Sequence, residues 1–206
     1  MKQGLPNYQF VQAFQFVFIT LITGTGIGLS VSLVASIFVA GLHFFVDQRH
    51  SMDEYLPSLK IADGSLVPLI WLIGAALLLW VVRRIFSIQR WHGPADSIFG
   101  AHRLDNEIDV KSGIGSTLAA FISLSGGASV GQYGPLVHFG ATIGTYIRSI
   151  FGNKSIGTDV FIGCGVAAAI AAGFHAPIAG IVFAHEAVLR HFSFRALTPI
   201  AISSIT

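Results

Sequence analysis

The chain has 206 residues, of which 53% are hydrophobic and 11% charged, and its mean hydropathy is +0.71. Soluble domains carry about a quarter charged residues, so the composition excludes an ordinary soluble domain and predicts an all-α, polytopic membrane protein. The net charge of +2 with scattered basic residues does not indicate nucleic-acid binding, and the single cysteine, Cys164, excludes a disulfide framework.

Charged residues are absent from four stretches, each with room for a membrane-spanning helix of roughly 20 residues. These stretches lie between Lys2 and Asp47, between Asp63 and Arg83, between Lys111 and Arg148, and between Asp159 and Glu186. The first is too long for a secretory signal, whose apolar part has about 7–15 residues. It predicts one long, tilted helix from Phe10 to Val46, in which we expect the glycines to make helix-packing contacts. These glycines are Gly24, Gly26 and Gly28.

A polar loop from Asp47 to Asp63 is expected next, and its charged residues are mainly acidic. The second predicted helix runs from about Leu66 to Ile88 and has basic residues at its end, namely Arg83, Arg84 and Arg90. Arginines beside short loops favour the cytoplasmic side. We therefore expect an integral protein of the cell (inner) membrane, with the N-terminus cytoplasmic and the acidic loop outside.

From Trp91 onward the apolar stretches are shorter and are broken by prolines. Proline is well tolerated at the first position of a helix, so Pro94, Pro135 and Pro177 predict three helix starts. Loop backbone at membrane depth is allowed only where it is buried in protein or lines a cavity, and channels and transporters bind ions with such broken helices.

The later part of the chain is rich in small residues and ends in a short apolar run. Alanine and glycine dominate Gly163 to Gly180, which lets helices approach closely. The run from about Leu197 to Thr206 is too short to cross a bilayer. We expect the chain to be truncated within a longer protein.

Glycines crowd the segment before Pro135, within the stretch from Ser125 to Gly144. A helix start there would offer unpaired backbone N–H groups and about half a positive charge, which suits an anion. Partial charges hold an anion loosely enough for it to move on. Tight packing is the equally weighted alternative role for these glycines.

Two motifs make the chain similar to the CLC family of chloride channels and chloride/proton transporters. GQYGPLVHFGATIG, Gly131 to Gly144, resembles the family's GREGP segment, and GFHAPIAGIVFAHEAV, Gly173 to Val188, resembles a second segment that ends in a glutamate pair. The resemblance covers essentially the whole chain and implies the first of two inverted halves, residues 1–206. It also implies a homodimer with one pore per subunit, chloride as the transported ion and no cofactor.

The first motif departs from the family at its functional residues. The resemblance places Tyr133 at the gating glutamate and Gln132 at the arginine. It implies that five residues of this motif line the anion pathway, namely Gly131, Gln132, Tyr133, Gly134 and Pro135. Glu186 aligns with the first residue of the glutamate pair and Ala187 with the second. Glu186 is thus a candidate internal acidic site, with a structural hydrogen bond as the alternative.

A third family motif, GSGIP, matches weakly at His92 to Asp96. This match puts Gly93 at the position of the serine that holds chloride and makes Gly93 and Pro94 candidate pore residues. We expect backbone N–H groups after Gly93 to replace the hydroxyl. Asp96 in the first helical turn is expected to stabilise the helix dipole and to point away from the pore.

Two other functions are alternatives to conduction of a small anion without proton coupling. Gly127 to Gly131 fits G-x-S-x-G, so a membrane-embedded serine hydrolase would use Ser129 with His138 or His175. A non-conducting structural membrane protein is the other alternative. His185 and Glu186 begin H-E-x-x-H, but Leu189 holds the second histidine position, so no metal site is predicted. We therefore predict a pore, not an enzyme.

Overall fold

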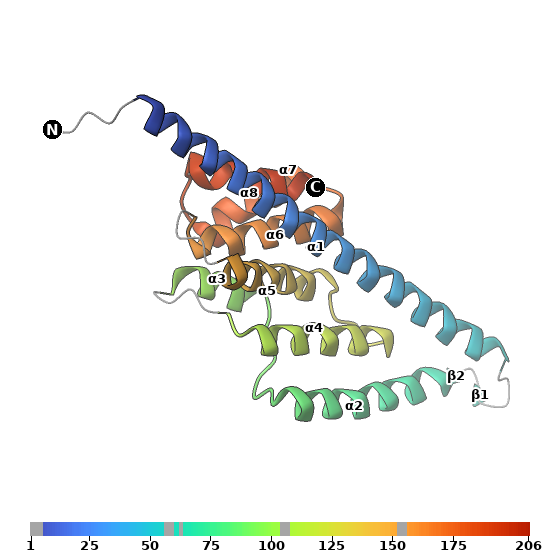
Figure 1. Cartoon of the computed structure of the whole chain (residues 1–206). Coiled ribbons are helices and arrows are strands. Elements are labelled where there is room, and N and C mark those ends of the chain that lie inside the picture. Colours follow the sequence, from blue (N-terminus) through green and yellow to red (C-terminus); the bar gives the residue numbers. More distant parts are fainter. Residues whose placement is uncertain (1–5, 56–59, 62–63, 104–107, 152–155) are drawn as a thin grey trace.

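The computed structural model describes residues 6–55, 60–61, 64–103, 108–151 and 156–206, except the side chains of 6–13, 60, 61 and 64. Helices make up most of this part, as predicted, and its described strands are one antiparallel pair of two residues each. In Figure 1 the first helix, α1, runs diagonally across the molecule, and α5, α4 and α2 form successive layers on one side of α6.

α1 spans Pro6–Tyr55 and is longer than predicted at both ends. Its 50 residues correspond to about 75 Å of helix, more than twice the roughly 30 Å of a hydrocarbon core. Gly24 and Gly28 face α8, where an added Cβ would meet the carbonyl oxygens of Pro199 and Ser203. The predicted packing role is therefore confirmed for these two glycines. Within the described residues Gly26 makes no such contact, because its added Cβ would meet no atom within 4 Å.

The prediction of a loop from Asp47 to Asp63 is wrong for its first part, because α1 continues through Tyr55. Polar residues on an exposed helix end remain solvated, so they do not stop the helix. Strands β1 (Lys60–Ile61) and β2 (Gly64–Ser65) pair before α2, and the rest of the expected loop lies outside the described residues.

α2 spans Val67–Phe86, close to its predicted bounds. Pro68 lies in its first turn. Ser87 ends the helix in the left-handed conformation, with φ of 55°, and its N–H caps the carbonyls of Arg83 and Arg84. Arg83 also donates to the carbonyls of Ile88 and Gln89, which fixes the turn after the helix.

Within the described residues, the broken region contains six α-helices and one π-helical turn. They are α3 (Pro94–His102), α4 (Val110–Ser125), α5 (Tyr133–Phe151), α6 (Thr158–Phe174), α7 (Pro177–Phe183), the π-helical turn η2 (Ala184–Leu189) and α8 (Phe194–Ile205). The helix starts at Pro94 and Pro177 are confirmed. The charge-free stretches after Lys111 and Asp159 each hold parts of two helices rather than one spanning helix.

α6 is the centre of the core, because all its residues from Val160 to Ala171 are buried. It packs against α1, α5, α7 and α8. The tightest approach is to α5, where a Cβ added to Gly140 or Gly165 would overlap the backbone of the other. The small residues of this segment therefore allow helix-to-helix contact inside the chain, as expected from its composition.

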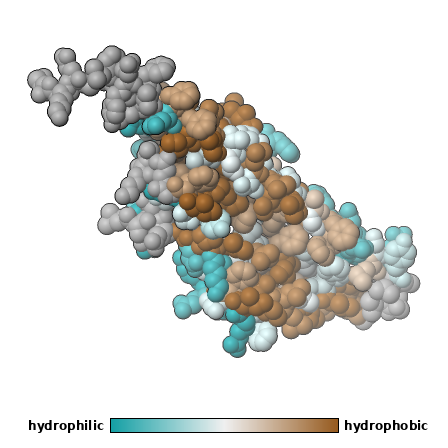
Figure 2. Space-filling view, viewed as in Figure 1, coloured by the Kyte–Doolittle hydropathy of each residue, from teal (hydrophilic) through white to brown (hydrophobic). Residues whose placement is uncertain are grey.

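A broad apolar surface remains outside this core. Figure 2 shows hydrophobic side chains over most of one face, with hydrophilic ones gathered toward its ends. α2 has only Val67 and Ala75 buried, and its exposed side chains include Ile73 and Leu77. In the described part of the chain, two helical stretches are long and apolar enough to cross a membrane, Phe14–Tyr55 and Val67–Phe86.

Candidate functional site

The start of α3 carries its own negative cap. The Asp96 carboxylate accepts a hydrogen bond from the Gly93 N–H at 2.8 Å and forms an ion pair with Arg90. The Asp96 N–H in turn donates to the Gly93 carbonyl at 3.0 Å. Asp96 therefore folds back on its own helix, as predicted. Because Pro94 has no N–H, Ala95 supplies the remaining N–H group of this first turn.

α5 begins at Tyr133, two residues before the predicted Pro135. The prediction was wrong because proline needs no hydrogen bond anywhere in the first turn, so it does not fix which residue comes first. The N–H groups of Tyr133 and Gly134 consequently lie in the first turn, where no intrahelical carbonyl can accept from them. The first turn of α5 holds no acidic residue, in contrast to α3.

The two helix starts lie against each other. A Cβ added to Gly134 would stand 3.5 Å from the ring of Pro94, which is ordinary van der Waals contact. Added Cβ atoms at Gly93 and Gly131 would meet nothing within 4 Å. The backbone on both sides of the junction is therefore open to a ligand, and the positive ends of two helix dipoles converge beside it.

The side chain of Tyr133 packs on the end of α6. Its ring stacks on Phe174 with 3.9 Å between centroids and an interplanar angle of 26°. A Cβ added to Gly173 would be 3.0 Å from the Tyr133 ring, so glycine makes room for it. The stack joins the α5 start to the segment that leads into α7. Sequence reasoning missed it, because ring contacts between separate motifs leave no spacing signal.

Behind the helix starts, Ser97 links α3 to α5. Its hydroxyl and the His138 Nδ1 are 2.8 Å apart, and both side chains are buried. The His92 ring stands edge-on to His138 with 5.7 Å between centroids, and the His92 N–H donates to the Ser116 hydroxyl at 2.9 Å. Ser97 was not among the predicted residues. His138 belongs to this packing cluster, whereas His175 is exposed and ends α6 with φ of 53°.

Glu186 lies on η2 and is exposed. In the part of the chain that the structure describes, its carboxylate accepts no hydrogen bond. The structural hydrogen bond offered as an alternative is thus not seen. The adjacent His185 is buried and its Nδ1 lies 3.0 Å from the Ile181 carbonyl.

Ser129 does not sit in a hydrolase geometry. It is exposed in the loop between α4 and α5, so a helix rather than a strand precedes it. The G-x-S-x-G nucleophile requires a strand before the serine and a helix directly after it. His138, one of its two candidate bases, is occupied by Ser97. The structure thus removes the support for a serine hydrolase.

Residues 74–206 match the voltage gated chloride channel family. Among individual relatives, a protein of Yersinia pestis named voltage-gated ClC-type chloride channel ClcB is 26% identical over 142 residues, covering 69% of this chain and 34% of that protein. The protein of that name in Escherichia coli O139:H28 is 28% identical over 184 residues, covering 85% and 43%. The chain therefore spans less than half the length of these relatives.

Among solved structures, the fold is similar to the crystal structure of a slow cyanobacterial Cl−/H+ antiporter. The TM-score is 0.70 at 21% sequence identity, and the match covers 90% of this chain and 44% of that one. At this identity the likeness concerns the arrangement of helices. Because the match covers 90% of this chain, it includes part of α1, all of which lies outside the residues matched by the family.

Proposed function

Because the chain belongs to the voltage gated chloride channel family of membrane proteins, we propose that it forms part of a transmembrane pathway for chloride or a similar small anion. The chain is the first of two halves of the complete transmembrane domain. Movement of the anion is not coupled to protons. The activity is transport and not catalysis.

The junction of α3 and α5 carries this proposal. The Tyr133 and Gly134 N–H groups offer partial positive charge without a competing carboxylate in the same turn. The nearby acid, Asp96, is already held by Arg90 and by the Gly93 N–H. The α5 start is therefore the stronger anion ligand, and α3 contributes mainly through its dipole and the Ala95 N–H.

Tyr133 is the basis for uncoupled movement. Tyr133 has a phenol in place of the carboxyl group of the gating glutamate that the resembled family has at this position. Its hydroxyl can still donate a hydrogen bond to an anion. The stack on Phe174 holds the ring beside the α5 start, where it serves as a ligand or as a steric lid.

The complete protein is proposed to be a homodimer in the inner membrane. α6 is buried within the chain. In the stretch from Gly163 to Gly180, α7 is therefore the helix that remains for a dimer face. Ile178 and Val182 project from α7 and are 78% and 46% exposed. The N-terminus and Arg83, Arg84 and Arg90 are placed on the cytoplasmic side.

Flux measurements on the complete protein in lipid vesicles test the function. Chloride efflux should exceed that of protein-free vesicles, and a pH dye inside the vesicles should show no proton movement linked to it. Absence of chloride efflux would favour the non-conducting alternative. Uphill proton movement driven by a chloride gradient would contradict uncoupled conduction and direct attention to Glu186.

A further inference from the structure

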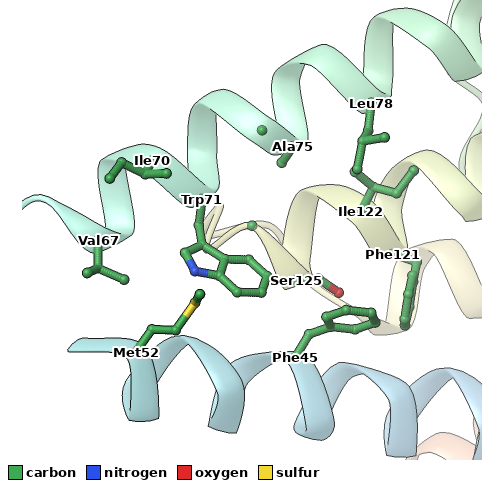
Figure 3. Close-up of a pocket in the computed structure, with 12 residues that line it drawn as sticks. Phe45, Met52, Val67, Ile70, Trp71, Ala75, Leu78, Phe121, Ile122 and Ser125 are labelled. Atoms are coloured by element: carbon green, nitrogen blue, oxygen red, sulfur yellow. The ribbon is translucent and has the colours of Figure 1, made fainter. Parts of the chain in front are cut away.

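A pocket of about 420 Å³ lies between the last third of α1, the first half of α2 and the end of α4. Figure 3 shows Trp71 in its middle, Met52 beside it, and the rings of Phe45 and Phe121 toward one end. Ligand sites typically have about 300–1,000 Å³ and mostly apolar walls with a few polar groups. The size and the lining of this pocket are those of a ligand site.

Ser125 supplies an unpaired hydroxyl to this pocket. It is the last residue of α4 and is 6% exposed, and its Oγ has no hydrogen-bond partner among the described residues. A buried hydroxyl without a partner costs free energy. The other polar side-chain group in the lining is the Trp71 indole N–H. These two groups offer a water molecule few partners, since an ordered buried water typically makes about three hydrogen bonds.

The pocket wall is continuous with the apolar outer surface of α2. Ile70 and Leu78 line the pocket and are also 52% and 55% exposed. In a membrane protein such a surface meets lipid hydrocarbon. The distance along α2 from Val67 to Leu78 is about 16 Å at 1.5 Å per residue, enough for an extended hydrocarbon chain to lie beside it.

A cationic group stands where α4 ends. Arg49 lies on the same face of α1 as Phe45 and Met52, which line the pocket, because four and three residues separate them. Its guanidinium occupies the space that a Cβ on Gly127 would need, next to Gly126 in the lining. The polar groups thus gather at the loop end of the pocket, and the hydrocarbon walls extend away from it.

We propose that this pocket binds one acyl chain of a membrane phospholipid. The ester carbonyl of the lipid accepts a hydrogen bond from the Ser125 hydroxyl, and its phosphate lies near Arg49. The acyl chain fills the space between Trp71, Phe121 and Leu78. This site is separate from the α3–α5 junction, so its occupancy can be measured without reference to anion flux.

Photo-crosslinking tests the site in the complete protein, reconstituted in phosphatidylcholine vesicles in which part of the lipid carries a diazirine on its acyl chain. After irradiation, peptide mapping should find lipid attached to Phe121 or Ile122, which face the pocket. Gly74→Phe should reduce this labelling at least fivefold. An added Cβ on Gly74 meets no atom within 4 Å, so the ring has room to enter the pocket.

Gly26→Phe is the matched control, since Gly26 is equally open but does not line the pocket. It should leave labelling of α4 unchanged. Ser125→Ala should lower labelling about fivefold, the equivalent of one hydrogen bond of about 1 kcal/mol, whereas Ser129→Ala should not. Two outcomes would overturn the proposal. One is labelling of Leu77 on the outer surface without labelling of α4, which means that protein covers the pocket. The other is labelling of α4 that Gly74→Phe does not change.

Discussion

The resemblance of the first motif implies that Tyr133 stands where the family has its gating glutamate. At the residue scale this predicts that Tyr133→Glu introduces a pH dependence that the unmodified protein lacks. An ionised carboxylate beside the α5 start competes with the anion for the same N–H groups, and a glutamate ordinarily has a pKa of about 4.3. Flux should therefore be several-fold lower at alkaline pH and recover as the pH falls and the carboxyl is protonated. Chloride efflux from vesicles at a series of pH values measures this.

Tyr133→Gln is the control for that change, because it has similar length and cannot ionise. Its flux should not depend on pH. A pH dependence shared by both variants would place the titrating group elsewhere in the protein.

Two substitutions of Asp96 separate the effect of its negative charge from the effect of its hydrogen-bond acceptor. Asp96→Ala removes the acceptor for the Gly93 N–H, and the loss of such a helix-end bond costs about 0.5–2 kcal/mol. A decrease of a few degrees in Tm is expected for a domain of this size. Asp96→Asn retains an acceptor oxygen and should lose less. Thermal unfolding in detergent measures both, and equal losses would assign the effect to the Arg90 ion pair instead.

At the scale of the elements, sequence patterns predicted helices best where proline or charge fixed a boundary. Pro94 and Pro177 begin helices as expected, because a residue without an N–H is favoured at a helix's first position. The end of α1 was missed, because its polar residues from Asp47 onward looked like a loop while they extend a helix into solvent. Polarity alone does not distinguish the two.

The candidate site was predictable only in part. The two helix starts could be found separately from their motifs, but the contact of Gly134 with Pro94 and the stack of Tyr133 on Phe174 depend on how α3, α5 and α6 pack. The Ser97–His138 bond joins residues 41 positions apart for the same reason. No local sequence pattern indicates such contacts between distant residues. Family resemblance does not predict them either at positions where this chain has other residues than the family motif.

The same substitution is expected to have opposite effects at Gly165, in the α5–α6 contact, and at Gly26, on an open side of α1. Gly165→Ala forces a methyl group into the backbone of Gly140, and overpacking of this kind costs about 1–3 kcal/mol. Gly26→Ala adds a methyl group in open space and gains up to about 1 kcal/mol of helix propensity. The first should lower Tm by several degrees and the second should not lower it. Tm is measured on the complete protein. A similar decrease of Tm in both variants would show that another part of that protein packs against α1 at Gly26.

At the scale of the whole molecule, the arginines in the last turn of α2 and shortly after it predict the orientation in the membrane. Cysteines introduced at Glu54 and Gln89, both exposed, should label on opposite sides. In intact cells a membrane-impermeant thiol reagent should reach Glu54→Cys directly and Gln89→Cys only after permeabilisation. The native Cys164 is buried and should not interfere. The reverse pattern of labelling would invert the proposed topology.

The amount of protein needed for conduction is a separate prediction for the whole molecule. The chain spans less than half the length of its relatives, and the backbone beside Gly93 and Gly131 is open rather than enclosed. An anion at the α3–α5 junction would therefore have ligands on one side only. In an open groove that faces lipid, no further dipoles surround the anion to replace its lost hydration shell. We expect vesicles containing the chain that ends at Thr206 to release chloride no faster than protein-free vesicles, while the complete protein conducts. Co-reconstitution with the remaining part, expressed separately, should restore flux if the two parts assemble. Robust chloride flux from the 206-residue chain alone would contradict this expectation and would mean that two copies in opposite orientations complete each other. Crosslinking between a Glu54→Cys copy and a Gln89→Cys copy would then detect such pairs.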